Sequence, residues 1–291
     1  MPRTRIALVT CTELPRPDLE LPVLAAAIER AGGEAAIASW DDPSVGWEGF
    51  DVAVIRSTWN YVRRFDAYTA WLERAAAATR LVNPLPVLRW NLHKRYLLEL
   101  AAAGVPVVPT VLLEPGERVG WSELFGRWGE LVLKPAISAG SFATIRVPPG
   151  DAARAEAHRA GHPTRTMMVQ PFLGSVLERG ERNLVHFGGR FSHALAKGAR
   201  WSGEPEASGA ALQPDPDEIT LARQALAAVE AKQLGAVAYA RVDIARDGQG
   251  RAVLMELEML EPSLFLERVP EAAGRFAAAV LAVERSSRDD G

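Results

Sequence analysis

Short apolar runs alternate with amphipathic segments along the N-terminal part of the chain. The runs at 5–10, 34–40 and 50–59 have the length and composition of strands, and the segments at 17–33 and 65–79 have the apolar spacing of helices. Strands that alternate with helices are typical of a parallel, doubly wound sheet. The pattern therefore predicts an α/β fold for this part of the chain.

The loops after the first and third strands are candidate ligand sites, because ligands of doubly wound sheets bind beyond the carboxyl ends of the strands. These loops read CTELPRPD, from residue 11, and RSTWNY, from residue 56. Arg56 stands at a strand end together with Ser, Thr, Trp and Asn, so we expect it to contact the substrate rather than to be a surface charge. For Trp59 the alternative is a packing role.

Two prolines near residues 82–90 interrupt the pattern and predict a boundary. An N-capped helix is expected to start at about Asn91 and to stop at Gly104, followed by a strand. The later elements are predicted in this order: two strands joined by a loop within 129–147, a strand at 167–173, a hairpin turning at Gly188-Gly189, a helix at 219–235, a hairpin turning at 247–250 and a final Ala-rich helix.

A turn-rich, polar segment from Trp201 to Pro216 is predicted to be a mobile loop. Together with the proline boundary, this organisation suggests three parts. They are an N-terminal α/β domain over 1–88, a small subdomain over 89–172 and a C-terminal subdomain over 173–291.

Composition narrows the class of protein. The chain has 291 residues, of which 48% are hydrophobic and 24% charged, as in ordinary globular proteins. A net charge of -3 provides no basic field for nucleic acid. Cys11 is the single cysteine, which excludes an internal disulfide, and no apolar run approaches the roughly 20 residues of a membrane span. We expect a cytoplasmic protein without nucleic-acid or membrane partners.

The stretch AVLMELEMLEPSLF, from residue 252, places acidic residues within an apolar strand. If the preceding DGQG turn has an even number of residues, Arg241 lies opposite Glu256 and Asp243 lies opposite Leu254. Strand alternation then puts Arg241, Asp243, Glu256 and Glu258 on one face and apolar residues on the other. Neighbouring carboxylates suit Mg2+, which prefers oxygen ligands. The alternative is a solvated face with ordinary cross-strand ion pairs.

Lysine is rare in this chain, which has 33 basic residues. The lysines are Lys94, Lys134, Lys197 and Lys232, and a chain so biased toward Arg is expected to keep Lys where a compact ammonium suits a phosphate. Lys134 precedes AISAGSFAT, a loop of small residues whose backbone N–H groups can approach phosphate oxygens. The loop does not have the spacing of a Walker A motif.

The order of these motifs over about 85–265 resembles the ATP-grasp superfamily of carboxylate–amine ligases. The resemblance implies two lobes that clasp ATP, with 89–172 as the ATP lid and 173–291 carrying the metal site. It also implies the following roles: phosphate contacts by Lys94, Lys134 and Ser141; adenine contacts by Gln170, Pro171, Phe172 and Leu173; ribose contacts by Glu181; Mg2+ ligation by Asp243, Glu256 and Glu258; and catalytic contacts by Lys197, Arg241 and Arg56. Many members have Glu-x-Asn where this chain has Glu256-Leu257-Glu258.

A narrower resemblance extends over almost the whole chain. The phrases SWDDPSVGWEGFDVAVIRSTWNY, VLRWNLHKRYLLELAAAGVPVVPT and MELEMLEPSLFL are similar to the ATP-grasp subgroup that includes the O-ureido-serine cyclo-ligase of cycloserine biosynthesis. This resemblance implies activation of a small amino-acid-like carboxylate as an acyl phosphate, attack by a nitrogen nucleophile, and ring closure. Asn60 stands where an aspartate is expected in STWDY.

Two other classes of function stay open at this point. One is a phosphotransferase that uses the same ATP cradle, and the other is a nucleotide-binding regulatory protein without turnover. Arg241 beside the acidic residues disfavours the second. Cys11 is interpreted as a packing residue, and no Ser-His-Asp or Cys-His set is apparent. The expected cofactors are ATP and Mg2+, the expected partner is a small amino-acid-like substrate, and the expected state is a monomer or homodimer.

Overall fold

The computed structural model describes residues 3–198 and 208–288. Its strands form three sheets, which follow one another along the sequence. The first sheet is parallel and the other two are antiparallel. This arrangement confirms the mixed α/β fold class.

The N-terminal part is a doubly wound sheet with strand order β2-β1-β3-β4. Its elements are β1 (Arg5–Thr10), α1 (Glu20–Arg30), β2 (Glu34–Ser39), η1 (Trp47–Gly49), β3 (Val52–Ser57), η2 (Trp59–Arg63), α2 (Phe65–Ala78) and β4 (Arg80–Val82). Both faces of β1 are covered: Ile6 and Leu8 join a core with α1, whereas Ala7 and Val9 join a core with α2. Each apolar run therefore reads as continuous rather than alternating.

The middle part has a four-stranded sheet in the order β5-β8-β6-β7. Its elements are α3 (Leu85–Leu92), α4 (Tyr96–Ala102), β5 (Val111–Leu113), α5 (Trp121–Trp128), β6 (Leu131–Pro135), β7 (Ile145–Val147), α6 (Ala152–Ala160) and β8 (Met167–Pro171). The predicted helix start at Asn91 is wrong. A proline in the first turn starts α3 earlier, and the buried Asn91 side chain instead donates to the Leu257 carbonyl at 2.7 Å.

The C-terminal part is a five-stranded sheet in the order β11-β10-β9-β12-β13. Its elements are α7 (Ser175–Glu178), β9 (Glu181–Phe187), β10 (Arg190–Lys197), β11 (Ser208–Leu212), α8 (Pro216–Glu230), β12 (Tyr239–Arg246), β13 (Ala252–Glu258) and α9 (Pro270–Arg288). The hairpin at Gly188-Gly189 is confirmed, with φ of 54° and 73°.

The predicted mobile loop from Trp201 to Pro216 is only partly described. Residues 201–207 lie outside the described residues. Residues 208–212 form β11, which pairs with β10, so the loop prediction is wrong there. Backbone pairing to an edge strand orders this polar segment, although it has little apolar surface to bury.

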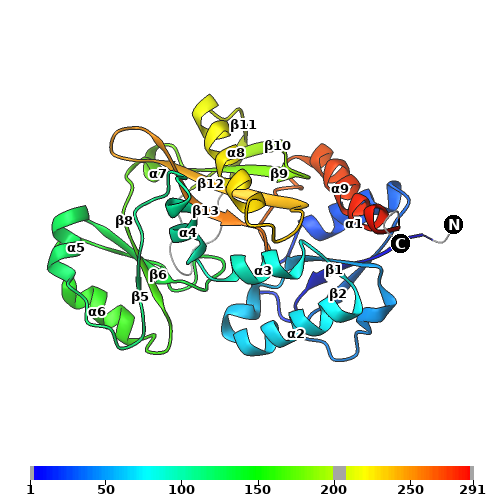
Figure 1. Cartoon of the computed structure of the whole chain (residues 1–291), viewed down its shortest axis with the longest axis horizontal. Helices are drawn as coiled ribbons and strands as arrows, with labels where there is room; N and C mark the ends of the chain where they lie inside the picture. Colours follow the sequence, from blue (N-terminus) through cyan, green and yellow to red (C-terminus); the bar gives the residue numbers. More distant parts are fainter. Residues whose placement is uncertain (1–2, 199–207, 289–291) are drawn as a thin grey trace.

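The C-terminal helix α9 packs against the first helix, α1. In Figure 1, α9 lies beside α1, while the middle sheet with α5 and α6 forms the opposite end of the molecule. Side chains of α3 and α4 share a core with α8 and the C-terminal sheet, which Met168 of the middle sheet also joins. The domain ranges 1–88, 89–172 and 173–291 stay a prediction.

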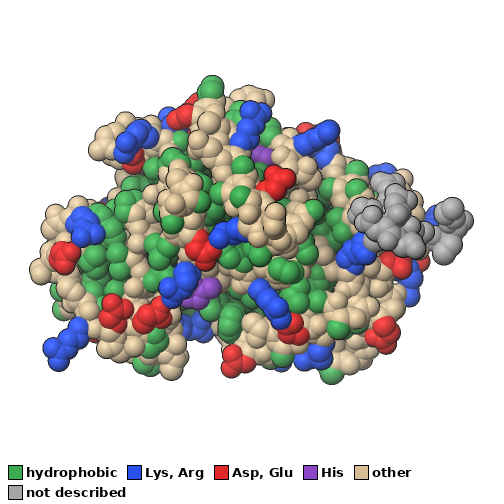
Figure 2. All heavy atoms as spheres, in the orientation of Figure 1, with side chains coloured by type: hydrophobic (Ala, Val, Ile, Leu, Met, Phe, Trp, Pro, Cys, Tyr) green, Lys and Arg blue, Asp and Glu red, His purple; other side chains and the backbone are tan. Residues whose placement is uncertain are grey.

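The surface carries both signs of charge. Figure 2 shows acidic and basic side chains interspersed over the visible face. In the described parts of the chain, no helix is both long enough and apolar enough to span a bilayer.

Candidate active site

A cavity of about 1240 Å3 is lined by residues of all three parts of the chain. The loops after β1 and β3, the loop after β6, the end of β8 and one face of β12 and β13 contribute to it. All but one of the predicted site residues line this cavity: Lys94, Lys134, Ser141, Gln170, Pro171, Phe172, Leu173, Glu181, Lys197, Arg241, Asp243, Glu256 and Glu258. The exception is Arg56. The individual roles of these residues stay predictions.

The β12–β13 hairpin places four charged side chains on the cavity face, but with a different pairing from the predicted one. Arg241 lies opposite Glu258, and Asp243 lies opposite Glu256. The predicted pairing assumed an even turn and a regular ladder. The last pair is Arg246–Ala252, which leaves five residues in the turn, and a bulge between Asp243 and Ile244 leaves Met255 as an extra residue. Met255 lines the cavity rather than the core. The predicted common face is retained because both strands keep their alternation on the cavity side of the bulge.

Three carboxylates converge on this face. Asp243, Glu256 and Glu258 each offer an oxygen within 4.8 Å of the others, and they form the single acidic or His/Cys cluster of this kind among the described residues. Burial raises the pKa of Glu258 to about 7, although Arg241 opposes the shift. Glu256 is buried too, yet the ammonium groups of Lys134 and Lys94 hold its pKa well below the usual range. Hard oxygen donors packed this closely fit Mg2+.

Arg241 lies between these carboxylates. Its Nε and Nη2 donate to the two oxygens of Asp243, each at 2.8 Å, and Nη2 also donates to Glu258 Oε1 at 2.6 Å. Asn183 donates a further hydrogen bond to Asp243 at 2.6 Å. The guanidinium is thereby fixed in direction, and its charge offsets two of the carboxylates.

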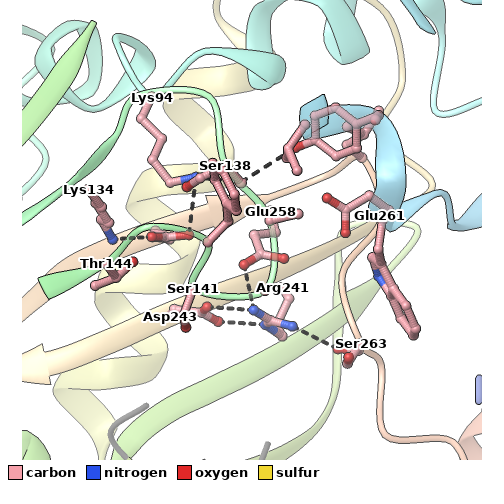
Figure 3. Close-up of a pocket in the computed structure, with 18 of the residues that line it drawn as sticks. Lys94, Lys134, Ser138, Ser141, Thr144, Arg241, Asp243, Glu258, Glu261 and Ser263 are labelled. Carbon is pink, nitrogen blue, oxygen red and sulfur yellow. Dashed lines mark hydrogen bonds and ion pairs between the residues drawn. The ribbon is translucent and has the colours of Figure 1, made fainter. Parts of the chain in front are cut away.

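Three of the lysines line the cavity: Lys94, Lys134 and Lys197. Figure 3 shows the first two. Lys134 Nζ donates to Glu256 Oε1, and Lys94 Nζ lies 3.7 Å from Glu256 Oε2. Lys197 Nζ lies 2.9 Å from Glu181 Oε2. Burial alone lowers the pKa of Lys197, but the Glu181 carboxylate more than compensates, so the pKa is raised and the side chain stays cationic.

Lys94 is not on a helix, as the sequence pattern suggested, but in the turn between α3 and α4. Its backbone amide donates to the Ala136 carbonyl at 2.8 Å, and its Nζ donates to the Ser138 carbonyl at 3.1 Å. The turn therefore ties the lysine to the small-residue loop after β6.

The small-residue loop has unusual backbone geometry. Gly140, Ser141 and Ala143 have φ of 60°, 60° and 51°, which is the left-handed region that non-glycine residues seldom occupy. The buried hydroxyl of Thr144, at the end of the loop, has no hydrogen-bond partner in the structure. Strained backbone and an orphaned donor are typical of a loop shaped for a ligand.

The segment after β8 forms the far wall of the cavity. Gln170 is buried, and its Nε2 donates to Thr110 Oγ1 at 2.9 Å. The Phe172 amide donates to the Glu130 carbonyl at 2.9 Å, and the Arg146 guanidinium lies 3.8 Å from the Phe172 ring centroid. These contacts fix a flat, largely apolar wall.

Arg56 lies away from the cavity, so the prediction that it contacts substrate is wrong. Its side chain is 2% exposed and donates to the Pro262 carbonyl at 2.8 Å and to Glu20 Oε2 at 3.2 Å. The rings of Tyr239 and Phe276 cover it. Both faces of a central strand in a doubly wound sheet are covered by other elements, so a strand-end residue can face the core instead of the ligand edge.

Arg16 and Glu261 also line the cavity, although no sequence pattern singled them out. The Arg16 guanidinium lies 4.3 Å from the Trp59 ring centroid, and Nη2 donates to Ser263 Oγ at 3.4 Å. Burial raises the pKa of Glu261 to about 8, with Glu258 as a further cause. Arg16 lies in the loop CTELPRPD, which the strand pattern predicts as a ligand loop, so the sequence did indicate this part of the cavity.

The Asn60 side chain contacts one hydrogen-bond donor and one acceptor. Its Oδ1 accepts from Trp40 Nε1 at 2.7 Å, and its Nδ2 donates to Asp41 Oδ2 at 2.8 Å. Asp41 also accepts from the Thr12 amide at 2.8 Å. An amide satisfies this arrangement, whereas an aspartate would face another carboxylate.

Comparison with known proteins identifies the family. A family model described as the N-terminal domain of D-cycloserine synthetase DcsG matches residues 6–83. The chain is 34% identical to the cycloserine biosynthesis protein DcsG of Streptomyces lavendulae over 296 residues, which is 94% of this chain and 97% of that protein.

Solved structures agree with this relationship. A crystal structure of D-cycloserine synthetase DcsG matches with a TM-score of 0.89 and 33% identity, covering 96% of this chain and 99% of that one. D-alanine–D-alanine ligase from Bacillus anthracis, in complex with ATP, shares the fold with a TM-score of 0.68 and 15% identity over 99% of this chain and 100% of that one. A RimK domain ATP-grasp protein from Sphaerobacter thermophilus also has a TM-score of 0.68, at 22% identity over 96% of this chain and 100% of that one. The chain therefore has the fold of the ATP-grasp ligases and belongs to the DcsG family.

Proposed function

We propose that this protein activates the carboxylate of a small amino-acid-like substrate as an acyl phosphate, and that a nitrogen of the same substrate then closes a ring. The observation that carries the proposal is the set of groups in one cavity: three converging carboxylates, three lysines and a guanidinium fixed between them. The relatives support it, since DcsG proteins are described as cycloserine synthetases.

The lysines supply the positive charge for the nucleotide phosphates. In the structure, Lys94 and Lys134 are both paired with Glu256. With nucleotide bound, the two ammonium groups would pair with phosphate and the Glu256 carboxylate would bind the cation. Ser141 and the small-residue loop are assigned to the same phosphates through backbone N–H groups. A related ligase has been solved with ATP, which supports ATP as the nucleotide here.

Mg2+ is the cation that Asp243, Glu256 and Glu258 would hold. Bound there, it would offset the charge of the phosphate oxygens during phosphoryl transfer. A third carboxylate, Glu258, replaces the asparagine of many ATP-grasp proteins, but it already accepts a hydrogen bond from Arg241. The residues fit the ion without an uncompensated charge.

Adenine and ribose are assigned to the wall after β8. The Phe172 amide already donates to Glu130, so Leu173 is the residue that offers adenine a backbone donor. Gln170 and Pro171 shape the same wall. Glu181 is assigned to the ribose hydroxyls, with Lys197 beside it as a contact to phosphate or substrate.

Arg241 orients the acid substrate. Its guanidinium is buried, directed by Asp243 and Glu258, and borders the cavity. A preorganised cation at this place stabilises the charge that develops on the carboxyl oxygens when phosphate is transferred and again when it leaves. Neither alternative class, a phosphotransferase or a regulatory nucleotide binder, is favoured by the family relationship.

A coupled ADP-release assay tests the proposal. The protein is given ATP, Mg2+ and either O-ureido-serine or one of the common amino acids, and the products are separated by mass spectrometry. We expect ADP and a cyclised product in equal amounts with one substrate. A phosphorylated substrate that accumulates would support the phosphotransferase, and ADP release independent of any substrate would contradict a ligase.

A further inference from the structure

The segment that follows β13 runs along the cavity without joining a sheet, and side chains hold its backbone. Arg56 donates to the Pro262 carbonyl at 2.8 Å. The Leu264 amide donates to both carboxylate oxygens of Glu20, at 2.9 and 3.0 Å. Arg56 and Glu20 are themselves paired in the core, so one buried ion pair fixes the segment at two points.

Two more side chains complete this attachment. Arg241 Nη1 donates to the Ser263 carbonyl at 3.1 Å, and His193 Nε2 lies 2.8 Å from the Leu264 carbonyl. Three successive carbonyls, from Pro262 to Leu264, are therefore bound by side chains from three different strands. A loop anchored this closely has the rigidity that a substrate-binding element needs.

Glu261 is the residue that this segment presents to the cavity. It is 9% exposed and lines the cavity, and Figure 3 shows its side chain next to that of Glu258. The four carboxylates on the β9, β12 and β13 side of the cavity each have a Lys or Arg partner: Glu181, Asp243, Glu256 and Glu258. Across residues 3–198 and 208–288, Glu261 forms no close ion pair. The charges of Lys94 and Arg241 reach it at longer range, and the Tyr61 hydroxyl is its hydrogen-bonding neighbour.

A buried carboxyl without a cationic partner is costly unless a ligand supplies donors. The substrate carboxylate, with its negative charge, belongs beside Arg241 rather than here. What remains of an amino-acid-like substrate is its nitrogen groups, which carry N–H donors, and the nucleophilic nitrogen is the one that must lie close to the activated carboxyl carbon. Charge and hydrogen-bonding chemistry therefore match Glu261 to the nitrogen end of the substrate.

We propose that Glu261 accepts a hydrogen bond from the nitrogen nucleophile and holds it against the carboxyl carbon that is activated beside Arg241. The inference rests on the proposed ligase function and adds the residue that positions the nucleophile. Arg56 and Glu20 are positioning residues, because they fix the backbone of Pro262 and Leu264 and thereby the position of Glu261 in the cavity.

The test separates carboxylate activation from attack by nitrogen. Wild type, Glu261→Gln and Glu261→Ala are incubated with ATP, Mg2+ and O-ureido-serine, with and without hydroxylamine, which traps an acyl phosphate as a hydroxamate. The readout is the ratio of cyclised product to trapped hydroxamate. Glu29→Gln, at an exposed glutamate of α1, is the control.

We expect the ratio to fall at least tenfold in Glu261→Ala and by a smaller factor in Glu261→Gln, which keeps an acceptor oxygen and the side-chain volume. An unchanged ratio in both variants would overturn the role of Glu261. So would a parallel loss of product and hydroxamate in Glu261→Gln with normal ATP binding, because Glu261 would then act in activation. If wild type forms neither ADP nor hydroxamate, the ligase function itself fails, which distinguishes the two conclusions.

Discussion

Replacing Arg56 by Met distinguishes a residue of the core from a residue of the substrate site. The guanidinium is 2% exposed and pairs with Glu20 at 3.2 Å, beneath the rings of Tyr239 and Phe276. Met keeps most of the apolar stem, so the substitution removes the charge without opening a large cavity. The Glu20 carboxylate is then left in the core with only the Leu264 amide as donor.

Breaking a buried ion pair by removing one partner costs about 3 to 5 kcal/mol. Two features place Arg56→Met at the lower end of this range. Nε and Nη1 of Arg56 have no hydrogen-bond partner, so part of its burial is uncompensated in the wild type. Burial also raises the pKa of Glu20 to about 7, so protonation relieves the orphaned charge at neutral pH. We therefore expect a loss of about 3 kcal/mol in the free energy of unfolding.

Urea unfolding followed by tryptophan fluorescence measures this loss, since the chain has 8 tryptophans. Arg5→Met is the control, because Arg5 and Glu34 form an exposed pair at 3.5 Å and such pairs contribute less than about 1 kcal/mol. The double variant Arg56→Met/Glu20→Leu should recover most of the lost stability, because it leaves no unpaired charge. Wild-type stability of Arg56→Met together with a tenfold weaker affinity for the substrate would refute this assignment.

Four further perturbations test other parts of the structure. Burial raises the pKa of Glu20 to about 7, so its stabilising contribution is complete below its unfolded pKa, roughly 4.3, and is lost as the pH rises through 7. Glu20→Gln should therefore flatten the pH dependence of the unfolding free energy between these values, by at most about 1.4 kcal/mol per pH unit. Urea titrations at several pH values measure this slope, and a slope unchanged from wild type would contradict the role of Glu20. Asn60→Asp places a carboxylate against Asp41 and removes a hydrogen-bond donor. Thermal melting should show that the free energy of unfolding falls by about 1 to 3 kcal/mol, and by more at pH 8 than at pH 5. An equal loss at both pH values would argue against charge repulsion. Glu256→Gln should abolish ATP turnover with Mg2+ in a variant that still folds, and wild-type turnover would remove Glu256 from the metal site. Lys134→Met should weaken ATP binding at least tenfold by calorimetry, and unaltered ATP affinity would show that its ammonium does not contact phosphate.

Local patterns predicted the parts of this fold that depend on local chemistry. Strand alternation was sufficient to put Glu256 and Glu258 on one face, because side-chain direction follows from the backbone period alone. Glycines with positive φ at Gly188-Gly189 were sufficient for the hairpin turn. The rarity of lysine identified three residues that the fold brings into one cavity.

Other features depend on contacts between distant segments and could not be predicted from local pattern. The β12–β13 register changes at a bulge beside Met255, which alternation does not encode. Arg56 faces Glu20 because α1 and α9 cover its side of the sheet, and their packing is a tertiary property. Glu261 stands in the same acidic stretch as the predicted metal ligands, but its lack of a close ion pair with any described residue appears only in the folded chain.

The most direct test of the account is oxygen transfer from the substrate to phosphate. O-ureido-serine labelled with 18O in its carboxylate is incubated with the protein, ATP and Mg2+, and the released phosphate is analysed by mass spectrometry. Activation as an acyl phosphate makes one carboxylate oxygen the bridge to phosphorus, and attack by nitrogen at the carbonyl carbon releases that oxygen with the phosphate. The account predicts one 18O atom in each phosphate released. Unlabelled phosphate formed together with a cyclised product would contradict it.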